Sequence, residues 1–283
     1  MRSIARLAPA SPGSALAWLS FVAYGSRVNV VALQFDIAWE NKPANFAKVR
    51  QLLAEARPPR DSLVVLPEMF ATGFSMNAEV VAEAYGGPTE QFLAGVAREF
   101  SVCLLAGAAM RGRDGRARNK ALAFSPAGEL LAWYAKMQPF TPGGEAEHYA
   151  AGEQTVAFRW DQCTVSPFIC YDLRFPELFR AAAAAHRPEL FAVIANFPEK
   201  RAQHWLRLLQ ARAIENQAYV VGVNRLGRDP YYTYAGRSVI IDPQGEIVAD
   251  AGGREGGIRA ELDLAGLQKY RAGLPFLADM KAR

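Results

Sequence analysis

Residues 164–197 read TVSPFICYDLRFPELFRAAAAAHRPELFAVIANF, and this stretch predicts a strand, a helix and a second strand in that order. Residues 164–170 and 190–197 are nearly continuous apolar runs, which are typical of strands buried on both faces of a parallel sheet. Between them, Pro176 takes a favoured first position of a helix that we expect to extend to His186. Strand–helix–strand units of this kind predict an α/β fold with helices covering the sheets.

The same alternation continues on both sides of this stretch. Upstream we expect strands at 28–35, 62–69 and 102–110, helices at 42–57 and 89–100, and a hairpin of 119–125 with 129–136. Downstream we expect a helix at 202–217, a strand at 218–224, and a hairpin of 237–241 with 246–250. The two hairpins share similar octapeptides, SPAGELLA at 125–132 and DPQGEIVA at 242–249. This repeat predicts two similar halves with one sheet each, packed face to face.

Composition narrows the class of protein. The 283 residues are 51% hydrophobic and 21% charged, which is a globular composition. The net charge of +4 is spread along the chain without the basic stripe of a nucleic-acid-binding protein. No apolar run is long enough for a membrane span. Cys103, Cys163 and Cys170 form no CxxC pair, so we expect a reducing, cytoplasmic location, with neither nucleic acid nor membrane as a partner.

Residues 1–26 stand apart from this pattern. They include Arg2 and Arg6, the apolar stretch 15–24 and no acidic residue. Such a segment fits a targeting sequence, a disordered extension or a start codon assigned too far upstream, and the sequence leaves the three open. We therefore expect residues 27–283 to form a single domain.

Several common chemistries lack their sequence signals. The chain has no GxGxxG, GxxxxGK[ST], GxSxG or SxxK motif, so neither a nucleotide nor the usual serine nucleophile is indicated. Its three histidines, His148, His186 and His204, have no metal-binding spacing. We expect no metal and no organic cofactor.

Three segments end an apolar strand with an ionisable residue. Glu68 lies in LVVLPEMFATGF (63–74), Lys136 in ELLAWYAKMQPF (129–140), and Cys170 in the stretch quoted first. Each residue alone has a purely structural explanation: a capping or ion-paired glutamate, a lysine whose stem covers apolar surface, a buried cysteine acting as a small hydrophobe. The polar residues that follow Cys170 favour function there, and we expect the helix beyond it to favour the thiolate.

Taken together, the three residues form a consistent catalytic set at one edge of an α/β core. A glutamate can take the proton of a thiol, the thiolate can attack a carbonyl carbon, and a lysine can stabilise the resulting oxyanion. This set predicts a cysteine hydrolase.

These motifs resemble those of the nitrilase, or carbon–nitrogen hydrolase, superfamily, whose members use a Glu-Lys-Cys triad. The resemblance extends from about Val28 to about Leu264 and includes HWLRLLQARAIENQAYVVGVNR (204–225) and DPQGE (242–246). It implies a four-layer αββα sandwich of two pseudo-symmetric halves. Members pair through helices into homodimers or larger assemblies, and we expect a homodimer here. It also implies Glu68 as base, Cys170 as nucleophile, and Lys136 with the backbone N–H of Tyr171 around the oxyanion.

Many members of this superfamily carry a second glutamate in the loop after the lysine. Here GGEAEHYAAG (143–152) offers Glu145 and Glu147, and the spacing to Gly152 favours Glu145 while leaving the choice open. The family often has a histidine two residues after the lysine, where this chain has Gln138. That difference affects substrate preference rather than activity.

Within the superfamily, CYDLRFPELFR (170–180) and ARAIENQAY (211–219) are most similar to the omega-amidase branch. The resemblance implies hydrolysis of the terminal amide of 2-oxoglutaramate or 2-oxosuccinamate through a thioester. The far carboxylate of such a small-molecule amide needs a cation, for which we expect Arg201 as a bidentate clamp. Arg174 is the reserve candidate, although a structural pair with Glu177 or Asp172 is favoured for it.

The remaining expectations concern the pocket and the competing functions. We expect Phe70, Phe74, Tyr171 and Phe197 to form its apolar walls. Sister specificities stay open: a deaminated-glutathione amidase, a nitrilase or a carbamoylase. A non-catalytic binding or scaffold protein on the same fold and a thiol redox protein are the alternatives from other classes.

Overall fold

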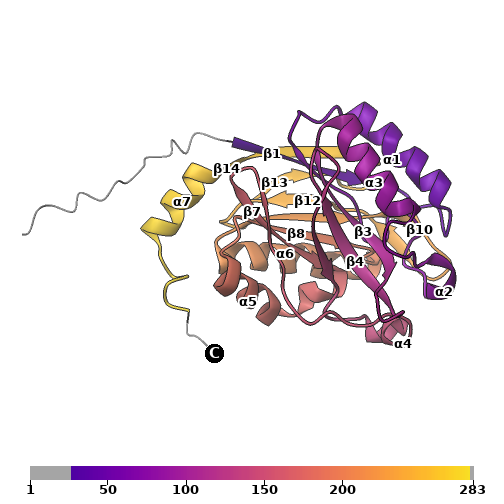
Figure 1. Cartoon of the computed structure of the whole chain (residues 1–283). Helices are drawn as coiled ribbons and strands as arrows, with labels where there is room; N and C mark the ends of the chain where they lie inside the picture. Colours follow the sequence, from indigo (N-terminus) through magenta and orange to yellow (C-terminus); the bar gives the residue numbers. More distant parts are fainter. Residues whose placement is uncertain (1–26, 281–283) are drawn as a thin grey trace, which may run out of the picture.

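The computed structural model describes residues 27–280, so the expectations for residues 1–26 lie outside it. Two six-stranded mixed sheets lie face to face, with helices on their outer faces (Figure 1). A two-stranded ribbon, β10 (Leu226–Arg228) with β11 (Thr233–Ala235), accompanies them. The four layers follow the order helix, sheet, sheet, helix, and the expected αββα sandwich is confirmed.

The first sheet has its parallel strands in the middle. Its strands, in spatial order, are β14 (Gly256–Asp263), β1 (Arg27–Gln34), β2 (Leu63–Val65), β3 (Cys103–Arg111), β4 (Ala117–Phe124) and β5 (Leu130–Ala135). The pairs β1–β2 and β2–β3 are parallel, whereas β14, β4 and β5 run antiparallel to their neighbours.

The second sheet repeats this plan. Its strands, in the matching order, are β6 (Phe158–Trp160), β7 (Cys163–Ile169), β8 (Leu190–Ala195), β9 (Tyr219–Asn224), β12 (Val239–Ile241) and β13 (Ile247–Asp250). Again the second, third and fourth strands are parallel and the outer ones antiparallel. The two pseudo-symmetric halves predicted from the hairpin repeat are therefore present.

The helices bury their apolar faces against the sheets. The longer ones are α1 (Lys42–Ala56) and α3 (Pro88–Phe100) over the first sheet, and α5 (Pro176–His186) and α6 (Ala202–Asn216) over the second (Figure 1). The shorter α2 (Ala78–Val81) and α4 (Glu145–His148) lie in loops, and α7 (Leu264–Gly273) follows β14.

Strand β1 shows why its sequence is apolar throughout. Val30 and Ala32 belong to the core between the sheets, whereas Val31 and Leu33 pack with the residues of α1 and α3. Successive side chains point to opposite faces of a strand, and here both faces are covered. A continuous apolar run is the result.

The strand predicted at 62–69 ends early, at Val65. Pro67 has no N–H for a sheet ladder, and Met69 takes a φ of +45°. Glu68 therefore lies in an irregular segment beyond the strand, where its side chain can turn toward the other sheet.

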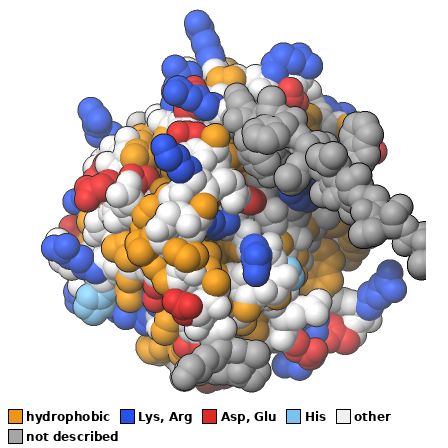
Figure 2. Space-filling view, turned by 90° about the vertical axis from the view of Figure 1, so that its left-hand side faces the viewer, with side chains coloured by type: hydrophobic (Ala, Val, Ile, Leu, Met, Phe, Trp, Pro, Cys, Tyr) orange, Lys and Arg blue, Asp and Glu red, His pale blue; other side chains and the backbone are white. Residues whose placement is uncertain are grey.

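None of the helices among residues 27–280 is both long and apolar enough to cross a membrane. On the face shown in Figure 2, Lys and Arg side chains are interspersed with Asp and Glu around hydrophobic ones.

Candidate active site

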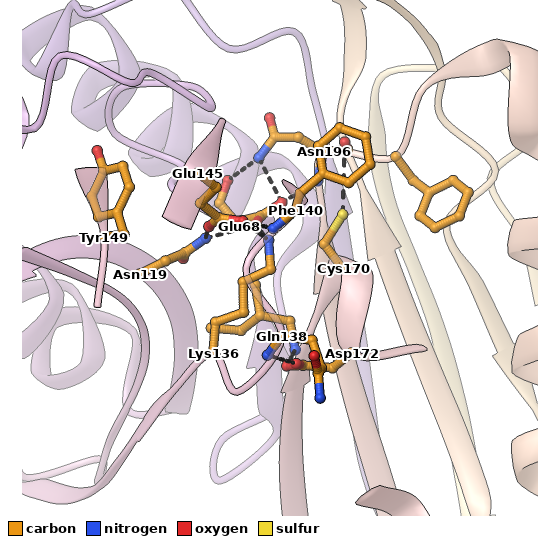
Figure 3. A network of polar contacts seen from close by, with 12 residues as sticks. Glu68, Asn119, Lys136, Gln138, Phe140, Glu145, Tyr149, Cys170, Asp172 and Asn196 are labelled. Atoms are coloured by element: carbon orange, nitrogen blue, oxygen red, sulfur yellow. Dashed lines mark hydrogen bonds and ion pairs between the residues drawn. The ribbon is translucent and has the colours of Figure 1, made fainter. Parts of the chain in front are cut away.

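The ends of three strands meet in one buried cluster (Figure 3). Glu68 follows β2, Lys136 follows β5 and Cys170 follows β7. The Lys136 Nζ donates to Glu68 Oε1 at 3.0 Å, and both side chains are buried. The structure thus brings together the three residues that the sequence singled out.

Asn196, directly after β8, links the thiol to the carboxylate. Its backbone N–H donates to Glu68 Oε2 at 2.7 Å, and its carbonyl oxygen accepts from Cys170 Sγ at 3.8 Å. Its side-chain amide donates to the Glu68 backbone carbonyl at 2.7 Å. One residue therefore orients Glu68 and faces Cys170.

The loop after Lys136 places one of its two glutamates in the cluster. Glu145 is fully buried, and its Oε2 accepts from Lys136 Nζ at 2.7 Å and from the Phe140 N–H at 2.6 Å. Glu147 is exposed. The geometry distinguishes the two candidates that the sequence left open.

Asn119 on β4 completes the cluster, and no motif had marked it. Its Nδ2 donates to Glu68 Oε1 at 2.7 Å and to Glu145 Oε1 at 2.9 Å. The usable signal was an asparagine on a predicted strand whose hairpin partner ends at Lys136. A polar side chain at that place lies beside the lysine.

The charges of the cluster fix its resting protonation. Burial opposes the charge of Lys136, but the carboxylates of Glu145 and Glu68 outweigh it and raise the pKa of the ammonium above its usual range. Burial, followed by the Glu68 carboxylate, raises the pKa of the Cys170 thiol well above its usual value, although Lys136 acts in the opposite direction. The resting site holds an ammonium and a neutral thiol.

The expectation that a helix favours the Cys170 thiolate is wrong. Cys170 opens a short 3-10 turn, Cys170–Arg174, and the first regular helix, α5, begins only at Pro176. The removal of the sulfur from water outweighs any effect of a helix dipole at that distance, because the dipole acts within about one turn. A base is therefore needed to activate the thiol.

A small pocket opens beside Cys170. It is lined by Phe74, Phe140, Cys170, Tyr171, Arg174, Asn196, Phe197, Pro198, Arg201 and Tyr232. The predicted Phe74, Tyr171, Phe197 and Arg201 are among these residues, whereas Phe140 and Tyr232 were not predicted. Tyr232 comes from the loop between β10 and β11, whose position the sequence did not indicate.

Two guanidinium groups line the polar part of this pocket. Arg201 lies over the ring of Phe140 at 5.4 Å, and Arg174 lies over the ring of Phe197 at 5.5 Å. Among residues 27–280, neither arginine forms an ion pair with a carboxylate. The pocket therefore combines aromatic walls with two cations available to an anionic group.

Comparison with known proteins places this geometry in a family. A family model described as carbon-nitrogen hydrolase matches residues 29–272. The chain belongs to the carbon–nitrogen hydrolase family. It is 39% identical over 259 residues to omega-amidase YafV of Yersinia enterocolitica, covering 90% of this chain and 97% of that protein. It is 33% identical over 253 residues to 2-oxoglutaramate amidase of Bacillus subtilis, covering 89% and 97%.

A solved structure agrees with this assignment. The crystal structure of XC1258 from Xanthomonas campestris, a CN-hydrolase superfamily protein with an arsenic adduct in its active site, matches with a TM-score of 0.85. It is 31% identical and covers 91% of this chain and 98% of its own. The resemblance inferred from the motifs is confirmed, and this protein is a hydrolase of carbon–nitrogen bonds other than peptide bonds.

In this carbon–nitrogen hydrolase, Phe70 does not line the pocket as predicted. The positive φ of Met69 turns the chain, and the Phe70 ring packs in the helix layer with Phe46 and Phe92, at centroid distances of 6.0 and 6.1 Å. Of the two aromatic residues that follow Glu68, Phe74 thus lines the pocket and Phe70 packs in the core.

The predicted pairing of Arg174 is also wrong. Asp172 accepts instead from the Tyr134 hydroxyl at 2.8 Å and from the Gln138 N–H at 2.8 Å. Arg174 contacts His204 at 3.3 Å and makes no ion pair with Glu177 in the described chain. This frees its guanidinium for the pocket.

Residues 27–280 contain no group of three or more His, Cys, Asp and Glu side chains arranged to hold a metal ion.

Proposed function

We propose that this hydrolase cleaves the terminal amide of a small 2-oxo dicarboxylic acid monoamide, 2-oxoglutaramate or 2-oxosuccinamate, to the 2-oxo acid and ammonia. One observation carries the proposal: the pocket beside Cys170 holds two guanidinium groups without carboxylate partners in the described chain. A substrate with an amide at one end and a carboxylate at the other fits that arrangement. The names of the two relatives given above support it.

In the first half of the proposed reaction, Cys170 Sγ attacks the amide carbon while its proton passes to Glu68. Lys136 and the backbone N–H of Tyr171 stabilise the oxyanion, since N–H groups at the start of a helical turn lack intrahelical partners. Glu68 then gives the proton to the leaving nitrogen. The carbon–nitrogen bond breaks, ammonia departs and a thioester remains on Cys170.

In the second half, Glu68 takes a proton from a water molecule that attacks the thioester carbon. The carbon–sulfur bond breaks, the 2-oxo acid is released and the thiol regains its proton from Glu68. The raised pKa of Lys136 keeps it charged throughout, so its part is electrostatic. Glu145 positions the ammonium and the Phe140 backbone.

For the far carboxylate we propose Arg201 as the principal clamp, with Arg174 beside it. Arg201→Ala should raise KM for 2-oxoglutaramate about tenfold or more and leave kcat nearly unchanged, because the residue binds a group remote from the reaction. Arg174→Ala is the matched comparison at the same pocket. A KM that stays at the wild-type value in Arg201→Ala would discard the clamp.

The decisive test is ammonia release from 2-oxoglutaramate by the wild type and by Cys170→Ala. We expect release by the wild type only, with Cys170→Ala folded and inactive. If the wild type were silent on 2-oxoglutaramate and 2-oxosuccinamate but cleaved deaminated glutathione, a nitrile or an N-carbamoyl compound, a sister specificity would replace the proposal. Stoichiometric labelling of Cys170 without ammonia from any amide would favour a binding or redox protein.

We further propose a cytoplasmic homodimer. The three unpaired cysteines suit a reducing compartment. Ile214 on α6 is 47% exposed on the outer helix layer and suits helix-to-helix pairing of two copies. Light scattering on the purified protein would give the mass, and Ile214→Glu should shift it toward the monomer.

A further inference from the structure

Asn119 lies between the two buried carboxylates of the site (Figure 3). We propose that it is a positioning residue for the general base, fixing Glu68 against Glu145 in the orientation that accepts the proton of Cys170. The inference rests on the proposed function, in which Glu68 is the base. The Asn119 amide donates to Glu68 and Glu145, so in this proposal it acts through Glu68 rather than on the substrate.

The hydrogen bonds determine which way the amide points. Both Nδ2 hydrogens are used, one on Glu68 Oε1 at 2.7 Å and one on Glu145 Oε1 at 2.9 Å. A flipped amide would set its oxygen against two carboxylate oxygens. The Oδ1 atom is buried and finds no partner in the described chain, which is unfavourable. The contribution of Asn119 is therefore its two donors.

The charges explain why a neutral donor is useful here. Lys136 Nζ already contacts both carboxylates, at 3.0 Å to Glu68 and 2.7 Å to Glu145. One cation facing two carboxylates leaves an excess of negative charge in a buried site, and the carboxylates repel each other. The Asn119 amide is a second bridge between them and adds no charge that would weaken Glu68 as a proton acceptor.

The sheet pairing places the amide accurately. The Asn119 carbonyl oxygen accepts from the Lys136 N–H at 2.9 Å, so the β4–β5 hairpin sets the two residues side by side. The titratable groups that surround Glu68 come from several elements: Lys136 at the end of β5, Glu145 on α4, Tyr149 after α4 and Cys170 after β7. Asn119 is the neutral member that contacts both glutamates.

Two substitutions remove the donors in different ways. Asn119→Leu has a similar volume and no polar atom, and we expect kcat to fall at least about tenfold with KM within about twofold. The acid limb of the kcat profile should move up by about one pH unit, because a carboxylate loses an N–H that favours its charged form. Asn119→Asp replaces the donor by an acceptor. We expect the fall in kcat of this variant, relative to the wild type, to be greater at pH 8 than at pH 6.

A matched control separates positioning from stability. Asn216 is 1% exposed and its Nδ2 donates to the Arg212 carbonyl at 3.0 Å, about 22 Å along α6 from the pocket-lining Arg201. Asn216→Leu should lower the melting temperature without moving the pH profile. The same behaviour in Asn119→Leu, with a wild-type acid limb and undiminished kcat, would make Asn119 merely structural and overturn the proposal.

A second readout works without a substrate. Iodoacetamide alkylates the Cys170 sulfur, with iodide leaving and the thiol proton passing to Glu68. At pH 7, Asn119→Leu should be alkylated about tenfold more slowly than the wild type, and Asn216→Leu at the wild-type rate. If the wild type failed to hydrolyse 2-oxoglutaramate, the proposed function would fail while this rate still decided the role of Asn119. An unchanged alkylation rate would refute that role.

Discussion

Asp172 shows at the scale of a single residue how burial and partners set ionisation in this site. Glu68 and Glu145 each contact the Lys136 ammonium, whereas the contacts of Asp172 are neutral donors: the Tyr134 hydroxyl and the N–H groups of Ile169 and Gln138. Burial dominates over these hydrogen bonds and raises the pKa of Asp172 to about 7. This carboxyl ties the turn after Cys170 to the segment after Lys136.

This raised pKa predicts how Asp172 contributes to stability. Because the pKa of Asp172 in the folded protein lies above the ordinary aspartate value of 3.8, the contribution is full below about pH 4 and is lost as pH rises to about 7. The free energy of unfolding of the wild type, minus that of Asp172→Asn, should decrease by roughly 3 kcal/mol between pH 4.5 and 7.5. Urea titrations at the two pH values measure it. A difference that is constant with pH would mean that Asp172 titrates alike in both states.

At the scale of elements, the sequence predicted best what depends on local pattern. Helix α5 has the predicted bounds, because Pro176 begins it and its apolar spacing is clear. Strand β14 was missed, since it lies at a sheet edge and alternates with exposed residues such as Glu261. The same holds for the site residues. Glu68 and Cys170 could be predicted because each follows an apolar run, which is a local pattern.

The residues that sequence reasoning missed depend on distant partners. Asn119 acquires its function from Glu145, 26 residues further on, and Asp172 from Tyr134, 38 residues away. Tyr232 reaches the pocket through the β10–β11 ribbon. For Asn119 the sequence indicated only its neighbour Lys136 across the predicted hairpin. It carries no local signal for the contacts of Asp172 and Tyr232, because tertiary packing alone creates them.

The junction of β7 with the following turn predicts an unusual order of stabilities. Cys170 takes a φ of +47°, a left-handed conformation that is costly for residues with a Cβ atom. Cys170→Gly should therefore be more stable than Cys170→Ala by about 1 kcal/mol, although both are inactive. Ala192→Gly, in the buried strand β8, is the control and should destabilise. Thermal unfolding compares the variants, and a Cys170→Gly protein less stable than Cys170→Ala would show that the junction relaxes.

At the scale of the whole molecule, the last strand and helix join the two halves. Strand β14 pairs with β1 over eight residue pairs, from Arg27–Asp263 to Gln34–Gly256, and completes the first sheet. Leu264 and Leu267 of α7 are buried in a hydrophobic cluster that contains residues of both sheets. The same helix then reaches the second half through Arg271. A segment late in the chain thus holds the sandwich together at one edge.

Arg271 makes the polar contacts of this connection, and its replacement should lower the stability of the protein without changing kcat. Its Nε donates to the Gln217 carbonyl at 2.8 Å and its Nη2 to the Pro188 carbonyl at 2.6 Å, on the chain after α6 and before β8. Arg271→Ala leaves two carbonyls without this donor and should lower the free energy of unfolding by about 2 kcal/mol.

The control is Lys269→Ala, an exposed change on the same helix, which should leave the free energy of unfolding nearly unchanged. Urea unfolding measures both, and kcat should equal the wild-type value in each, since α7 contributes no residue to the pocket. Equal stabilities of the two variants would show that the halves are held by the apolar core alone.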